Sequence, residues 1–177
     1  KGTIHLANEF YDAANPALRA LHRAFIRHSL DQLGDQPNVI HELAFQYAGP
    51  LAFQQFFQDT VAEWEREHGR RLRLALTTGK NVTDAILADP ARAAQIAVID
   101  QRYWQYRPDG ELWAPEAGLN LAFREINSAK WGKAGGDTPP PTTAAMVYRQ
   151  VREYRDRFPE KAIVAHDSGN GPVPILM

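Results

Sequence analysis

The chain has 177 residues, of which 44% are hydrophobic and 23% are charged, a composition typical of one globular domain with its own core. Its net charge of -1 at pH 7 gives no electrostatic reason to expect nucleic acid as a partner. The lack of cysteine excludes disulfides and thiol catalysis, and no apolar run approaches membrane-spanning length, so we expect no membrane partner. The start at Lys1-Gly2 and the apolar end PVPILM favour a segment of a longer protein with further domains. We therefore expect one domain, or a fragment of one, over residues 1–177.

The first half of the chain predicts strands that alternate with helices. TIHLANEF (3–10) is expected to be a strand that ends in polar residues. Asn15-Pro16 then supplies a helix N-cap and a proline at the first helical position, and the helix is expected to stop at Gly34. NVIHELAFQY (38–47) predicts a second strand, because its nearly continuous apolar content suits a parallel strand covered on both faces. A second amphipathic helix follows over 51–69.

The second half of the chain continues the same alternation around one long irregular region. Strands are expected at 71–78, 96–104 and 161–167, with a helical passage at 81–94 and a helix at 142–158. The passage at 81–94 is interrupted at Asp89-Pro90, because the residue before a proline disfavours helical geometry. The region 105–141 holds many glycines and the run Pro139-Pro140-Pro141. Irregular segments this long are usually functional or disordered.

This alternation predicts an α/β fold with parallel βα repeats, and two architectures fit it. A doubly wound open sheet usually shows a glycine-rich phosphate loop after its first strand, and ANEFYDAANP has no glycine. A complete (β/α)8 TIM barrel takes roughly 250 residues and eight strands. We therefore expect a partial (β/α)8 TIM barrel of about five strands.

Polar and aromatic residues collect where the predicted strands end, which is where parallel α/β folds bind ligands. The set is Asn8-Glu9, Gln46-Tyr47, Thr77-Thr78, Arg102-Tyr103-Trp104 and His166-Asp167, with Trp113 and Trp131 nearby. Any single member is more often a polar residue at the surface than a ligand contact. As a set, these side chains suit a hydroxyl-rich ligand, because sugars need hydrogen-bonding partners and aromatic platforms.

Two residues in the second strand need separate interpretations. If Gln46 points inward, strand alternation places Glu42 inward as well, near the opposite end of the strand. A structural ion pair of Glu42 with Arg73 on the next strand is then expected. His41 is expected on the outer, helix-covered face as a packed residue. The six histidines show no metal-binding spacing, so we expect no metal and no cofactor.

Three segments of the sequence resemble the corresponding segments of a known protein family. PNVIHELAFQYAGPLAFQQFFQDTVAEWE resembles the fourth strand and fourth helix of (β/α)8-barrel glycoside hydrolases. DQRYWQY and DGELWAPEAGLNLAFRE are similar to bacterial glycosidase-like proteins that often carry a further, collagen-binding domain. FPEKAIVAHDSGNGPVPILM resembles their seventh strand. The resemblance implies a carbohydrate substrate, a secreted or periplasmic location, an acid/base at the end of the fourth strand and a nucleophile near the end of the seventh.

Carried over by position, the acid/base falls on Gln46 and the nucleophile on Asp167. A glutamine cannot give a proton to a leaving group at neutral pH. In a second register, the Asn-Glu pair of ANEF makes Glu9 the acid/base, with Asp100 or Glu116 as its partner. In the first register Glu9 belongs to the third strand, beside the fourth, and reaches the same cleft.

The sequence thus predicts a glycoside hydrolase-like fragment. The candidate catalytic residues are Glu9, Asp167 and Glu116, and the candidate substrate-binding residues are Asn8, Gln46, Arg102, Tyr103, Trp104 and Trp113. Two alternatives stay open. One is a catalytically degenerate barrel that binds glycans without hydrolysis, as Gln46 suggests. The other is an α/β enzyme outside the glycosidases that uses the same cleft.

Overall fold

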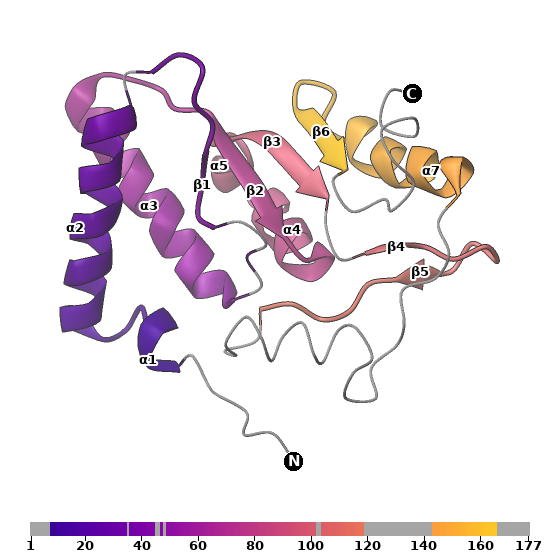
Figure 1. Cartoon of the computed structure of the whole chain (residues 1–177), viewed down its shortest axis with the longest axis horizontal. Coiled ribbons are helices and arrows are strands. Elements are labelled where there is room, and N and C mark those ends of the chain that lie inside the picture. Colours follow the sequence, from indigo (N-terminus) through magenta and orange to yellow (C-terminus); the bar gives the residue numbers. More distant parts are fainter. Residues whose placement is uncertain are drawn as a thin grey trace.

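Figure 1 shows a computed structural model of the chain, and the structure describes residues 8–34, 36–44, 47, 49–101, 104–118 and 143–165 (for residues 8 and 9, the backbone only). Four parallel strands form one sheet, in the order β1-β2-β3-β6. They are β1 (His41–Glu42), β2 (Leu74–Thr78), β3 (Ile96–Gln101) and β6 (Ala162–Ala165). The helices are α1 (Asn8–Tyr11), α2 (Pro16–Leu33), α3 (Leu51–His68), α4 (Lys80–Leu87), α5 (Pro90–Ala93) and α7 (Ala144–Arg155). The expected α/β class with parallel βα repeats is confirmed.

The helix boundaries follow the capping signals in the sequence. The Asn15 side chain accepts hydrogen bonds from the first backbone N–H groups of α2, and Pro16 occupies the first turn. Gly69 ends α3 at φ 63°, a left-handed conformation that glycine adopts without strain. Asp89 separates α4 from α5 by capping α5 with its side chain, so the expected interruption is confirmed.

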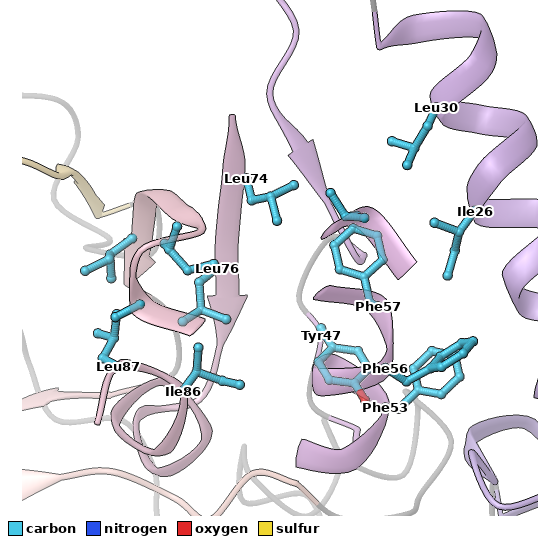
Figure 2. Packing of buried hydrophobic residues seen from close by; sticks show 14 of the residues in the cluster. Ile26, Leu30, Tyr47, Phe53, Phe56, Phe57, Leu74, Leu76, Ile86 and Leu87 are labelled. Carbon is cyan, nitrogen blue, oxygen red and sulfur yellow. The ribbon is translucent and has the colours of Figure 1, made fainter. Parts of the chain in front are cut away.

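The hydrophobic core lies between one face of the sheet and the helices. Leu74, Leu76 and Ile99 project from β2 and β3 into this core and are at most 1% exposed. The helices supply aromatic and aliphatic partners from α2, α3, α4 and α7 to the same cluster. Figure 2 shows the α3 phenylalanines close to Ile26 and Leu30 of α2.

The opposite face of the sheet carries a different set of side chains. In the register of β1, β2 and β3, Glu42 lies beside Ala75, Ala75 beside Val98, and Thr77 beside Asp100. Side chains two positions apart on a strand point to the same face, so all of these share one face. His41 is in register with Leu74 on the helix-covered face, as expected. The sheet therefore has one apolar, helix-covered face and one face with polar groups.

The predicted strands are longer than the observed ones, and the first two of them differ most from the structure. Residues 8–11 form helix α1, so the strand expected over 3–10 is wrong at 8–10, and residues 1–7 lie outside the described part. Phe10 and Tyr11 of α1 pack edge-on against each other, and the Tyr11 ring lies 5.2 Å from that of Phe53, so tertiary packing overrides the strand-like pattern. Among the described residues of the strand expected over 38–47, only His41–Glu42 are paired, and Ile40, just before them, is 51% exposed.

The irregular region expected over 105–141 contains a short paired segment at its start. β4 (Gln105–Tyr106) and β5 (Leu112–Trp113) pair antiparallel, with Gln105 opposite Trp113. Gly110, at φ 90°, lies in the connecting turn, where a left-handed conformation favours glycine. Figure 1 shows β4 and β5 beyond the arrowheads of β2 and β3, at the end of the sheet where the strands have their carboxyl termini.

Candidate functional site

A polar group of side chains lies on the face of the sheet opposite the core. The Thr77 hydroxyl donates a 2.7 Å hydrogen bond to Glu42 Oε2 and so ties β1 to β2. Asp100 is the register partner of Thr77 on β3 and is 5% exposed. Three neighbouring strands therefore present a carboxylate, a hydroxyl and a second carboxylate on one face.

The expected ion pair between Glu42 and Arg73 is wrong. Glu42 is exposed and accepts its hydrogen bond from Thr77, while the Arg73 guanidinium donates to the carbonyl oxygen of Pro37. The two partners differ because Glu42 shares a face with Thr77, whereas Arg73 precedes β2 and reaches back to the loop before β1. Glu42 is thus turned toward the polar face and away from the arginine-rich amino ends of the strands.

A segment that carries Glu116 is held at the carboxyl end of β2. The Asn81 side chain donates a 2.7 Å hydrogen bond to the Ala117 carbonyl oxygen, and Ala117 N–H donates at 3.0 Å to Asn81 Oδ1. A Cβ on Gly79 would lie 2.4 Å from the Ala117 Cβ, so this close approach requires glycine at position 79. Glu116, adjacent to this anchored residue, is exposed. One candidate carboxylate is therefore placed at the expected edge of the sheet.

Lys80, just after the carboxyl end of β2, lies at the centre of a partly buried polar cluster. Its ammonium group contacts Asp84 Oδ2 at 2.7 Å and Glu153 Oε1 at 2.6 Å. Burial lowers the pKa of Lys80, but the hydrogen bonds and charges of the two carboxylates outweigh burial and raise the pKa above its usual value. Lys80 therefore stays charged and joins α4 to α7.

Two tyrosines complete the same cluster. Tyr154 donates to Asp84 Oδ1 at 2.8 Å, and Tyr106 donates to Glu153 Oε2 at 2.6 Å. Burial, and then the nearby carboxylates, raise the pKa of both hydroxyls, so both remain protonated donors at neutral pH. Tyr106 belongs to β4, so this cluster fixes the β4–β5 hairpin against α7.

Trp104 and Trp113 occupy core positions in this structure. Trp104 is 3% exposed, packs edge-on against Tyr154 at 5.7 Å, and has the Lys80 ammonium 5.0 Å from its ring centre. Its carbonyl oxygen accepts a 2.8 Å hydrogen bond from Gln150 of α7. Trp113 is buried in β5. A ring that stacks on a sugar needs an accessible face. The burial of both tryptophans does not support the expected stacking role, which stays a prediction.

A pocket of about 230 Å³ opens beside β1, between the sheet edge and α2. Its walls are mainly aromatic and aliphatic, with Phe10, Tyr11 and Tyr47 among them, and Glu42 and His41 supply polar atoms. Burial raises the pKa of the Tyr47 hydroxyl, which donates to the Pro50 carbonyl oxygen, and lowers the pKa of His41, which is therefore neutral at pH 7. The pocket thus combines a carboxylate with aromatic rings.

Most other predicted site residues lie outside the described part of the chain. Asn8 and Glu9 are placed in α1 by their backbone alone, and the remaining ones, together with Trp131, are not described: Gln46, Arg102, Tyr103 and Asp167. Among the residues that the structure describes, no three His, Asp or Glu side chains lie together as metal ligands. None of the described helices has the length and hydropathy of a membrane span.

Asn81 and Lys80 were not found from the sequence. Both closely follow Thr77-Thr78, so their place at the carboxyl end of a predicted strand was visible. Asn81 hydrogen-bonds to a residue 36 positions away, and Lys80 forms an ion pair with Glu153 on α7. No local sequence pattern predicts contacts between residues so far apart in the chain.

Fold and site together define an α/β protein whose parallel sheet carries two carboxylates and one hydroxyl, those of Glu42, Asp100 and Thr77, on the face opposite the helix-packed core. The chain belongs to the DUF6298 family, described as a domain of unknown function, whose model matches residues 2–173. Searches of curated proteins and of solved structures found no match.

Proposed function

We propose that this chain forms part of a (β/α)8 barrel of the glycoside hydrolase type, which acts on a carbohydrate through carboxylates at the strand ends. The strand order β1-β2-β3-β6 carries this proposal. Each successive strand adds on the same side of its predecessor and runs parallel to it.

This order favours a barrel over a doubly wound sheet. Parallel crossovers are right-handed in about 98% of cases, so strands added always in one direction place all their helices on one face. A doubly wound sheet reverses direction at a switch point and has helices on both faces. In this chain the apolar core lies on one face, and Glu42, Thr77 and Asp100 share the other, which corresponds to a barrel interior.

Hydrolysis of a glycosidic bond at the carboxyl ends of the strands needs two carboxyl groups. Retaining glycosidases hold them about 5–5.5 Å apart, and inverting ones about 6.5–9.5 Å apart to admit a water. Glu116 is anchored at the carboxyl end of β2, and Asp167 follows β6 by two positions in the sequence. Glu9, whose backbone lies in helix α1 and not at a strand end, is the third candidate, because Gln46 cannot act as the acid.

Hydrolysis of a panel of glycosides by the natural full-length protein tests the proposal. Glu116→Gln, Asp167→Asn and Glu9→Gln each replace a carboxylate by its amide, and Glu111→Gln, an exposed residue in the β4–β5 turn, is the matched control. Loss of a true acid/base is expected to lower kcat by about 10²–10⁴-fold, with little change in the control. Full activity in all three carboxylate variants would exclude these assignments.

Gln46 favours a second function, a barrel that binds glycans without cleaving them. Gln46→Glu places a glutamate at the position where the glycoside hydrolases have their acid/base, and this variant separates the two functions. Hydrolysis gained by this variant would support a degenerate hydrolase. Glycan binding without turnover in both forms would support a binding domain.

A further inference from the structure

Two ion pairs cross the surface between α2 and α3 with the same spacing. Arg23 pairs with Glu63, and Arg27 pairs with Glu67, each with a separation of 40 positions. The pairs are one helical turn apart on both helices, so they form two steps of a regular ladder. The next step toward the start of both helices is Arg19 and Asp59.

This third step is not formed. Asp59 instead binds Arg92 of α5, with Oδ1 3.0 Å and Oδ2 3.4 Å from the guanidinium nitrogens. Arg92 also donates to the Gln55 carbonyl oxygen at 3.1 Å, which fixes it against α3. Arg19 consequently has no acidic partner among the described residues, and its guanidinium lies 5.8 Å from the Phe56 ring centre.

A groove of about 480 Å³ lies at this interrupted step. Four arginines line it, together with two carboxylates, which leaves two positive charges in excess: Arg19, Arg23, Arg66 and Arg92 against Asp59 and Glu63. Arg66 is exposed, and its Nε donates to the Ala62 carbonyl oxygen at 3.3 Å, so the two terminal nitrogens of the guanidinium are not used in this hydrogen bond. Phe56 and alanines supply apolar walls.

We propose that this groove binds a doubly charged oxyanion, a phosphate or sulfate group, between Arg19 and Arg66. Guanidinium groups bind such groups with paired, charge-assisted hydrogen bonds. The pair between Arg92 and Asp59 keeps Asp59 from neutralising Arg19. The site lies on the helical surface and does not depend on the proposed hydrolase activity.

Isothermal titration of the natural full-length protein with inorganic phosphate, inorganic sulfate and a sulfated monosaccharide tests this site. Arg19→Gln and Arg66→Gln are each expected to weaken binding about tenfold, while Arg152→Gln, which removes the same charge from an ion pair on α7, leaves it unchanged. Asp59→Asn is expected to strengthen binding, because it removes a negative charge from the groove. If the sulfated monosaccharide binds more tightly than inorganic sulfate, the bound group belongs to a larger ligand. If the two bind with equal affinity, the ligand is the free ion. Either result supports the site.

Three results would overturn the proposal: no binding of any of the three probes by the unmodified protein, an equal loss in Arg19→Gln and Arg152→Gln, or weaker binding in Asp59→Asn. Circular dichroism of each variant separates a lost site from a lost fold, since Arg19 and Arg66 are both exposed.

Discussion

Replacing Asn81 by alanine removes the side chain that holds the segment around Glu116 against α4. Two hydrogen bonds are lost, one donated to the Ala117 carbonyl oxygen at 2.7 Å and one accepted from Ala117 N–H at 3.0 Å. Each is worth about 0.5–1.5 kcal/mol net, so the loss is about 1–3 kcal/mol. The better helix propensity of alanine in α4 offsets roughly 0.5 kcal/mol of this.

Urea unfolding of the natural full-length protein measures the change in the free energy of unfolding, and hydrogen exchange measures the local change at Ala117. We expect a destabilisation of about 1–2 kcal/mol and faster exchange of the Ala117 amide, with amides of β2 and β3 affected less. Asn38→Ala is the matched control, because Asn38 is exposed in the turn before β1. Unchanged stability and unchanged Ala117 exchange in Asn81→Ala would refute the role assigned to Asn81.

Three further predictions concern the packing that supports the site. Gly34→Ala would place a Cβ 2.4 Å from the Trp64 ring and 2.6 Å from the Leu30 carbonyl oxygen, so we expect a destabilisation of about 1–3 kcal/mol in urea unfolding, and an unchanged midpoint would contradict the close approach. Lys161→Met leaves the carbonyl oxygens of Ala93 and Ile96 without their buried ammonium donor, so we expect a loss of about 1–3 kcal/mol, whereas Gln36→Met, at an exposed position, should be nearly neutral. The pKa of Lys80 is raised in the folded state, so its stabilising effect is complete below the unfolded pKa of 10.5 and is lost as pH rises through the folded pKa. The stability difference between the unmodified protein and Lys80→Met should therefore shrink above that pH, and a difference independent of pH would contradict the charged contact with Asp84 and Glu153.

Local signals predicted the helices well. Asn15-Pro16 and Gly69 act through the backbone of their own turn, so the start of α2 and the end of α3 follow from neighbouring residues. Gly34 follows α2 as expected, but its φ of -63° is helical. The need for glycine there comes from Trp64 on the next long helix, a contact that could not be inferred locally.

Strand ends and side-chain partners depended on distant contacts. TIHLANEF has a strand-like pattern, yet Phe10 and Tyr11 are in a helix because they join an aromatic cluster with Phe53 of α3. The partner of Glu42 was wrongly expected to be Arg73, since the register that sets Thr77 on the same face was unknown. Asp100 and Glu116 were both candidates from the sequence, and the structure places Asp100 on the face opposite the core and Glu116 at the carboxyl edge of the sheet.

The polar side chains on the face opposite the core have a physical consequence for the proposed barrel. A sheet face bearing Glu42, Thr77 and Asp100 cannot be packed against an apolar helix layer without large desolvation costs. A barrel interior with a polar cleft accommodates the same groups, because they hydrogen-bond with one another or with a hydroxyl-rich ligand. The hydrogen bond between Thr77 and Glu42 is one such contact.

A crystal structure of the natural full-length protein tests the central claim most directly, because the claim concerns which face of this sheet is enclosed by strands. We predict that β1 and β6 each gain a further parallel neighbour, that all helices stay on the face of Leu76 and Ile99, and that Glu42, Thr77 and Asp100 face the enclosed interior. A helix packed across Glu42, Thr77 and Asp100 would contradict the barrel and, with it, the proposed glycosidase site.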